Sequence, residues 1–174
     1  HCNPANDEIL SEYRFIKASQ WVNMYAQVDA IPVERSTVDI NEVDPKVHED
    51  MIDWTSIVST VLFAKRNLDT NIFRSGIENS FLKAFLLKVD GRPVATAMLY
   101  CGVKEVGVYM VATLPEFQKK GMGQQIMHTV IQAAKKLNYK TVVLQSTPGG
   151  VSLYEKMGFE KAGSAILYYS LIKI

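Results

Sequence analysis

Alternating apolar positions and one turn dipeptide define a hairpin near the middle of the chain. Two apolar runs, residues 81–89 and 93–101, flank Asp90-Gly91, a dipeptide suited to a tight turn with positive φ. The sequence therefore predicts an antiparallel hairpin. After a short turn at residues 102–105, the run VGVYMVAT predicts a third strand at residues 106–113.

A helical stripe follows this strand. From Gly121 onward, apolar residues recur at the spacing of one helix face, and Asn138 is a suitable C-terminal cap. The stripe consists of Ile126, Met127, Val130, Ile131, Ala134 and Leu137. His128 lies one position away from it, so we expect this side chain to face solvent.

The rest of the C-terminal part alternates between strand and helix. β-Branched residues predict a short strand at residues 141–146, and the segment GGVSLYEKM predicts a short helix that Gly158 ends. The apolar run at residues 165–173 predicts a terminal strand. No linker interrupts residues 75–174.

The N-terminal part has a weaker pattern. It predicts a strand at residues 12–19 and then a helix that starts at Ser19 and carries Trp21, Val22, Tyr25 and Val28. Residues 30–44 have no sustained period and indicate a loop. Asp44-Pro45 predicts the start of a second helix, which ends near residue 66 where the pattern dissolves.

Composition and charge narrow the class of protein. The 174 residues are 48% hydrophobic and 21% charged, which is typical of one globular domain and excludes disordered and fibrous chains. A formal net charge of +1 gives no net attraction to nucleic acid or anionic lipid, and no apolar run approaches the ~20 residues that span a bilayer. We expect one domain over residues 8–174, residues 1–7 being a tag remnant or stub, with no nucleic-acid or membrane partner.

Cysteine and histidine residues give no sign of a metal site. Cys2 and Cys101 are too few for a disulfide framework, which favours a reducing, cytoplasmic location. Neither cysteine has a partner at ligand spacing, and His1, His48 and His128 show no such spacing either. No metal is expected.

The segment QKKGMG, which begins the striped helix, carries the most specific chemistry. Gly121 and Gly123 let backbone amides approach a ligand closely, and the free amides and dipole of a helix start favour a phosphate. Lys119 and Lys120 add positive charge, and Gln118 can donate a hydrogen bond. The segment therefore indicates an anion site; the alternative is a tight turn with solvated lysines.

Other phosphate-binding motifs do not fit. The pattern GxxxxGK[ST] is absent, and Ile126 stands where a dinucleotide GxGxxG needs its third glycine. Residues 118–123 instead match the Q-x-x-G-x-G signature and so resemble the GCN5-related N-acetyltransferases. Residues 108–117 resemble that family's fourth strand and the loop after it, and Tyr154 before Gly158-Phe159 resembles its Y-x-x-x-G-F element.

The resemblance covers about residues 80–170. It implies an α/β (α+β) fold whose central sheet is mixed, mostly antiparallel, six to seven strands wide, splayed between its fourth and fifth strands and flanked by helices. It also implies that acetyl-CoA binds with its pyrophosphate on the amides of residues 119–124, its pantetheine beside the edge of Met110 to Thr113. The implied cofactor-binding residues are Met110, Val111, Ala112, Thr113, Gln118, Lys119, Lys120, Gly121, Met122, Gly123, Gln124, Thr147 and Tyr154.

The same resemblance also implies catalytic roles for residues of this chain. Many members use a glutamate on the fourth strand to take the amine proton, but Gly107 stands where such a glutamate can stand. Glu105, two residues earlier on the same strand face, either acts through a water or is a solvated turn residue. A backbone amide near Met110 or Val111 is implied to stabilise the oxyanion, and Tyr154 to donate a hydrogen bond or proton to the departing thiolate.

One further position departs from the family pattern. Many members carry an asparagine seven residues before the tyrosine, where this chain has Thr147. The hydroxyl of Thr147 or Ser146 either binds the cofactor or caps the short helix.

Three functions stay open on the sequence. The first is acetyl transfer to a primary amine of a small molecule, by direct attack in a ternary complex; the second is transfer to a protein lysine or N-terminus; the third is binding of acyl-CoA without turnover. Residues 30–44 hold four acids, Glu34, Asp39, Glu42 and Asp44, against Arg35, which favours a cationic acceptor. We expect a monomer or a homodimer.

Overall fold

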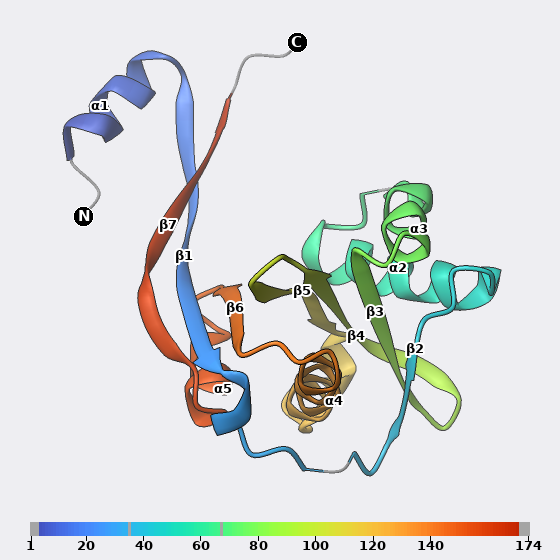
Figure 1. The fold of residues 1–174 in the computed structure, drawn as a ribbon. Coiled ribbons are helices and arrows are strands. Elements are labelled where there is room, and N and C mark those ends of the chain that lie inside the picture. The colour runs from blue at the N-terminus through green and yellow to red at the C-terminus, as the bar shows by residue number, and fades with distance from the viewer. Residues whose placement is uncertain (1–3, 35, 67, 171–174) are drawn as a thin grey trace.

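The computed structural model describes residues 4–34, 36–66 and 68–170 and contains one sheet with helices on both faces (Figure 1). The helices are α1 (Pro4–Glu12), α2 (His48–Leu62), α3 (Thr70–Glu78), α4 (Met122–Lys136) and α5 (Val151–Lys156). The strands are β1 (Phe15–Gln27), β2 (Asp39–Glu42), β3 (Leu82–Val89), β4 (Arg92–Cys101), β5 (Glu105–Thr113), β6 (Thr141–Ser146) and β7 (Glu160–Ser170).

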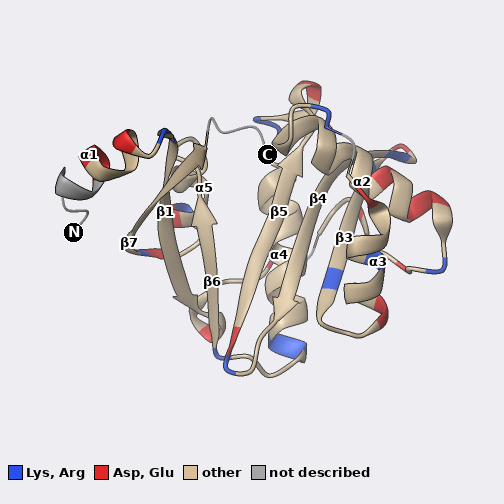
Figure 2. Ribbon diagram, turned by 90° about the horizontal axis from the view of Figure 1, so that it is seen from above, with Lys and Arg blue, Asp and Glu red and all other residues tan. Residues whose placement is uncertain are grey.

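The sheet has seven strands in the order β2-β3-β4-β5-β6-β1-β7. Figure 2 shows β7, β1, β6, β5, β4 and β3 side by side in this order. β5 and β6 are parallel, whereas every other neighbouring pair is antiparallel. The mixed, mostly antiparallel sheet flanked by helices is therefore confirmed.

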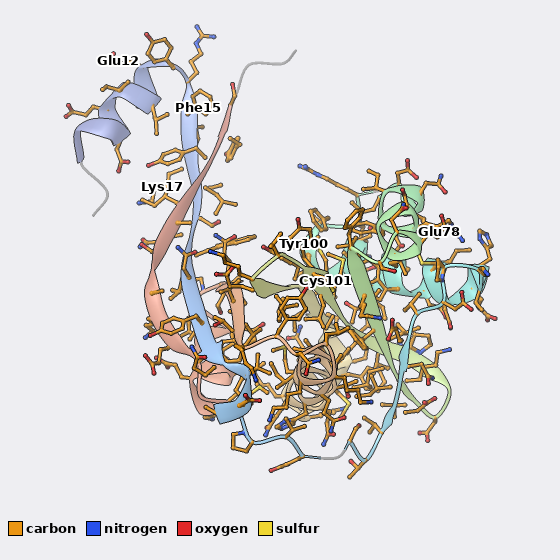
Figure 3. All side chains as sticks on the ribbon, viewed as in Figure 1. Glu12, Phe15, Lys17, Glu78, Tyr100 and Cys101 are labelled. Carbon is orange, nitrogen blue, oxygen red and sulfur yellow. The ribbon has the colours of Figure 1, made fainter. Side chains whose placement is uncertain are left out.

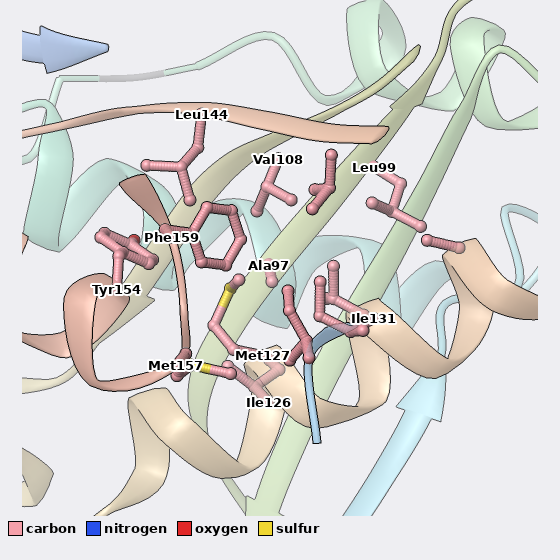
Figure 4. Packing of buried hydrophobic residues seen from close by; sticks show 14 of the residues in the cluster. Ala97, Leu99, Val108, Ile126, Met127, Ile131, Leu144, Tyr154, Met157 and Phe159 are labelled. Carbon is pink, nitrogen blue, oxygen red and sulfur yellow. The ribbon is translucent and has the colours of Figure 1, made fainter. Parts of the chain in front are cut away.

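The alternating residues of the central strands separate two cores. On β3, Phe85 and Leu87 join the core that packs against α4, whereas Ala84 and Leu86 join the core that packs against α2 and α3. Figure 4 shows Met127 and Ile131 of α4 on the side of the strand residues Ala97 and Leu99, with Tyr154 and Phe159 at the other end of the same core. Two-sided burial fixes the register of these strands because a slip by one residue would exchange the two faces.

The local signals in the second half of the chain predicted the elements well. Asp90 (φ 50°) and Gly91 (φ 77°) form the predicted turn between β3 and β4. Asn138 adopts φ 61° directly after α4, as a helix-ending residue does. The stripe is buried except at its last position, Leu137, which is 40% exposed.

The helix predicted from Ser19 is wrong, because these residues belong to β1. Val22 pairs with Ser146 of β6 and with Ser164 of β7, so β1 lies between two strands. Met24 and Ala26 are buried in the core against α4, which gives the segment a period of two. Pairing on both edges therefore decided a conformation that the local apolar spacing left ambiguous.

Three other boundaries differ from the predictions. The second helix, α2, starts later and ends earlier than predicted, since Asp44 Oδ1 accepts a hydrogen bond of 2.9 Å from Lys46 N in a turn before it. β2 lies in the predicted loop, and α3 lies where no element was predicted, capped by Asp69 Oδ1 on Asn71 N at 2.9 Å. β7 begins five residues before the predicted strand, of which residues 171–173 lie outside the described ranges.

β1 and β7 continue beyond the sheet as a two-stranded ribbon. β1 pairs with β7 from Phe15 onward, but with β6 only from Val22 onward. Figure 1 shows this ribbon projecting from the sheet with α1 at its tip, and Figure 3 labels Phe15 and Lys17 on it. In the described ranges, no helix is long and apolar enough to cross a membrane.

Candidate functional site

A slot opens between β5 and β6 because these parallel strands diverge. Their pairing runs from Glu105 opposite Thr141 to Val108 opposite Leu144, and then it stops. Tyr109, Ala112 and Thr113 of β5 pair with β4, and residues 109–113 have no partner on the β6 side among the described strands. Such an edge can hydrogen-bond an extended ligand, and the divergence is the splay that the family resemblance implied.

A bulge shapes the β5 side of this slot. The register between β4 and β5 shifts between Thr96 and Met98, and Met110 adopts a left-handed φ of 51°. The hydroxyl of the fully buried Thr96 donates a 2.9 Å hydrogen bond to the carbonyl oxygen of Met110. Because a side-chain-bearing residue rarely adopts this φ, the bond helps to hold an unfavourable conformation that redirects the Met110–Val111 peptide.

The N-terminus of α4 leaves backbone amides in an open position. Gly121, the N-cap residue, has φ 82°, and a Cβ atom there would meet no atom within 4 Å. The first amides of α4 are therefore approachable and carry the positive end of the helix dipole. Gly123 instead allows α5 to pack closely, because a Cβ atom on it would lie 3.3 Å from Leu153 Cδ2 of α5.

Basic side chains from β4 and from the loop before α4 meet at the ring of Phe117. Lys120 Nζ lies 5.3 Å from the ring centroid of Phe117, and Arg92 Cζ lies 5.1 Å from the same centroid. Arg92 also pairs with Glu116. Gln118 Nε2 donates a 3.0 Å hydrogen bond to Thr113 O, so this side chain ties the loop to the end of β5.

Tyr154 is buried where α5 meets the main core. It is 8% exposed and stacks edge-on with Phe159, the ring centroids being 5.8 Å apart (Figure 4). Burial raises the pKa of Tyr154 to about 12. The phenol therefore stays protonated across the neutral range, and among the described residues its hydroxyl has no hydrogen-bond partner. It can donate a hydrogen bond, whereas loss of its proton is strongly disfavoured.

Ser146 and Thr147 have different surroundings. Ser146 is buried and its hydroxyl donates a 2.8 Å hydrogen bond to the carbonyl oxygen of Thr147. A Cβ atom on Gly150 would lie 2.8 Å from the same hydroxyl oxygen, so the Ser146 side chain fills the space under this glycine. Thr147 is exposed, and its side chain is the better candidate for a ligand contact.

The predicted base region has an unexpected aromatic neighbour. Glu105 is exposed and makes no ion pair among the described residues. A Cβ atom on Gly107 would lie 2.6 Å from Tyr109 Cε2, so the Tyr109 ring lies over this glycine. Glu105 and Met110 are five residues apart, roughly 16 Å along a strand, which exceeds the span of one bridging water.

His128 does not face solvent, contrary to the prediction. The side chain is 5% exposed, and its Nδ1 atom has no hydrogen-bond partner in the described part of the chain. Its Nε2 atom lies 3.4 Å from Gln124 Nε2, one helical turn earlier. The core therefore extends one position beyond the purely apolar stripe.

The residues that the sequence predicts for the site lie on β5, in the loop before α4, at the start of α4, after β6 and on α5, whereas two neighbouring residues were not predicted. Thr96, which supports Met110, carries no local signal because its partner lies on the neighbouring strand. Tyr109 could have been suspected, since Gly107 stands two residues earlier on the same strand face. Among the described residues, no group of three or more His, Cys, Asp and Glu could hold a metal ion, and Cys101 is a free thiol.

The comparisons with known proteins agree with this geometry. The sequence model of the acetyltransferase (GNAT) domain matches residues 58–167. The chain therefore belongs to the GNAT family. The ribosomal protein bS18 alanine N-acetyltransferase of Escherichia coli K12 is 27% identical over 88 residues, which are 49% of this chain and 60% of that enzyme. The chain thus spans less than two thirds of this curated relative.

Solved structures share the fold. A GCN5-related N-acetyltransferase from Kribbella flavida has a TM-score of 0.73 at 20% identity, covering 98% of this chain and 65% of that one. A predicted acetyltransferase from Clostridium acetobutylicum, solved with acetyl-CoA, has a TM-score of 0.61 at 19% identity, covering 71% of this chain and 90% of that one.

Proposed function

We propose that this chain transfers the acetyl group of acetyl-CoA to a primary amine by direct attack in a ternary complex. The slot between β5 and β6 carries this proposal, because it combines a free strand edge with an open helix N-terminus at α4. A strand edge suits the amides of a pantetheine arm, and a helix N-terminus suits a pyrophosphate. Membership of the GNAT family supports the same reaction.

The residues around the slot fit acetyl-CoA. The amides of residues 119–124, with the charges of Lys119 and Lys120, would hold the pyrophosphate. The edge of Met110–Thr113 would pair with the pantetheine, and the hydroxyl of Thr147 would add a polar contact. Bound acetyl-CoA supplies a thioester that an uncharged amine can attack.

Two groups of the chain would then assist the chemistry. The bulge turns the Met110–Val111 backbone, and an amide there would donate a hydrogen bond to the developing oxyanion. Tyr154 would donate a hydrogen bond toward the leaving sulfur. Because its pKa lies far above the ~8.5 of a thiol, full proton transfer from the phenol would be uphill, so its role is that of a donor.

A small-molecule acceptor is favoured, and a protein acceptor is the alternative. Acidic residues between β1 and α2 favour a cationic amine, although Glu42 already pairs with Lys83 at 2.6 Å and Arg35 lies outside the described ranges. The alternative is supported by curated relatives that acetylate the alanine of a ribosomal protein. A single domain, a cytoplasmic location and a monomeric or homodimeric state remain predictions.

Initial rates of thiol release test the proposal when acetyl-CoA and the amine are varied together. Direct attack in a ternary complex predicts intersecting double-reciprocal lines, whereas an acetylated enzyme intermediate predicts parallel lines. The panel should contain small amines and a peptide with an N-terminal alanine. Tight acetyl-CoA binding with no thiol release for any amine would support a binding module instead.

A further inference from the structure

One face of the sheet is left open beside the slot. α2 and α3 pack on β3, β4 and the end of β5, where Met98 and Ala112 join their core. Beyond them lies a hollow of about 520 Å³ on the strands β5, β6, β1 and β7. Its lining includes Asn23, Tyr25, Glu105, Tyr109 and Gln145. Figure 1 shows the ribbon of β1 and β7 on one side of this region and α2 and α3 on the other.

The hollow reaches the mouth of the slot. Val108 and Leu144 are the last paired residues of β5 and β6. Tyr109 and Gln145, which line the hollow, follow them directly in sequence. A molecule in the hollow can therefore approach a ligand in the slot past Leu144, which lines the hollow and also joins the core against α4.

The side chain of Tyr109 points back along β5 toward Gly107. With a Cβ atom placed on Gly107, Tyr109 Cε2 would be 2.6 Å away and the hydroxyl oxygen 3.2 Å away. The ring thus occupies the space above residue 107, and Tyr109, which lines the hollow, is 42% exposed. An exposed tyrosine face attracts a cation, and the hydroxyl can accept a hydrogen bond from an amine.

The charge of the hollow favours a cation. Glu105 is the charged residue among its lining residues. It lies two residues from Gly107 and four from Tyr109, which places it roughly 7 to 13 Å along the strand from the Tyr109 ring and the slot mouth. Asn23 and Gln145, joined by a 3.0 Å hydrogen bond, line the hollow without adding charge.

We propose that this hollow binds the acceptor, that Tyr109 holds the acceptor amine at the slot mouth, and that the acceptor carries a second positive charge that pairs with Glu105. The inference rests on the proposed function and deepens it, since it names the acceptor as an extended amine with two cationic groups. Glycine at residue 107 is required because any larger residue would displace the Tyr109 ring.

Linear diamines with nitrogen spans of roughly 7, 10 and 13 Å, chosen from the strand spacing, are the probes. Each is compared with the monoamine of the same chain length by thiol release. We expect the best diamine to have a KM about twofold to fivefold lower than its monoamine, as for one exposed ion pair, because both amines make the same contact with Tyr109. Glu105→Gln should abolish this preference, whereas Glu78→Gln, at a distant exposed acid on α3, should keep it. Equal KM values for diamine and monoamine in the wild type would overturn the inference.

The position of Tyr109 is tested with a double-mutant cycle. Tyr109→Leu and Gly107→Ala should each raise the diamine KM several-fold, and the double variant should be no worse than Tyr109→Leu alone because both changes remove the same contact. Tyr169→Leu, at an exposed tyrosine of the ribbon, is the control and should leave KM unchanged. Additive effects of the two substitutions would contradict the assignment, and thermal melts verify that each variant is folded.

Calorimetry of the diamines separates this inference from the proposed function. If no amine releases thiol, the proposed function fails, while diamine binding that is lost in both Tyr109→Leu and Glu105→Gln still supports a cation site in the hollow. If thiol is released but diamine binding and KM are the same in these variants and in the wild type, the hollow is not the acceptor site and the proposed function stands.

Discussion

The hydroxyl of Thr96 and the carbonyl oxygen of Met110 are joined by a 2.9 Å hydrogen bond across β4 and β5. Thr96 is fully buried, and Met110 is the left-handed residue of the bulge beside the slot. The conformation of the slot edge therefore depends on a side chain of the neighbouring strand, which can be changed without touching any residue proposed to contact acetyl-CoA.

We expect Thr96→Val to lower the free energy of unfolding by about 1–2 kcal/mol, because it leaves a buried carbonyl without its side-chain partner. It should also weaken acetyl-CoA binding, since the bulge loses a support. Thr55→Val is the matched control: Thr55 is buried and its hydroxyl donates to Met51 O at 2.7 Å, within α2. Urea unfolding and calorimetry with acetyl-CoA measure both effects. Equal acetyl-CoA affinity in the two variants would contradict a role for Thr96 in the slot.

Gly121→Ala should weaken acetyl-CoA binding at least about tenfold. The left-handed φ of 82° costs an alanine about 1–2 kcal/mol, so the loop would shift and move the first amides of α4. Gly123→Ala is the comparison, because its φ is ordinary and its Cβ atom would only press on Leu153 Cδ2 at 3.3 Å. We expect the smaller loss there. The reverse order of affinities would show that close approach at Gly123 matters more than loop geometry.

Local signals predicted the elements that are specified by nearby residues. The hairpin at Asp90-Gly91, the stripe of α4 and the strand β6 follow from turn chemistry and periodicity. The loop before α4 was predicted for the same reason, since its lysines and glycines all lie within residues 119–123. The residues proposed to contact acetyl-CoA lie between β5 and α5, whereas Thr96, which supports Met110, lies on β4.

Long-range pairing explains what could not be predicted. β1 is a strand because it lies between β6 and β7, which are more than a hundred residues away in sequence. Residues 19–28, which include most of β1, also fit a helical spacing, so the neighbouring strands decide the conformation of this segment. The bond from Thr96 to Met110 and the burial of His128 likewise depend on neighbours in space.

Met24 lies in the strand β1, where the sequence predicted a helix, and its burial there can be tested. Its side chain is 1% exposed in the core against α4, so Met24→Ala should lower the free energy of unfolding by about 2–5 kcal/mol. Phe15→Ala, on the exposed end of the same strand, should cost less than about 1 kcal/mol. Urea unfolding compares the two variants. A similar small cost for both would contradict the burial of β1 in the sheet.

Tyr154→Phe should lower kcat by about tenfold to a hundredfold with little change in acetyl-CoA affinity, because it removes a donor used in the transition state. Single-turnover rates and calorimetry separate the two quantities. Wild-type kcat in the Phe variant would assign Tyr154 to packing alone.

Tyr154→Phe should also differ from the wild type in how its free energy of unfolding changes at alkaline pH. The folded-state pKa of about 12 lies above the unfolded value near 10, so the protonated phenol stabilises the fold fully below pH 10 and that contribution is lost as pH rises toward 12. The loss amounts to about 2–3 kcal/mol. Tyr154→Phe should therefore lose less stability than the wild type between these pH values. Parallel unfolding curves for the two proteins would mean that the phenol is not buried.

The most direct measurement of the central claim follows an isotope-labelled acetyl group from acetyl-CoA into the product by mass spectrometry. We predict that the label appears on the nitrogen of a primary amine, in a one-to-one ratio with released thiol, and that Gly121→Ala slows both together. Bound acetyl-CoA whose label never reaches any amine, in a panel that includes diamines and an alanine peptide, would contradict acetyl transfer by this chain.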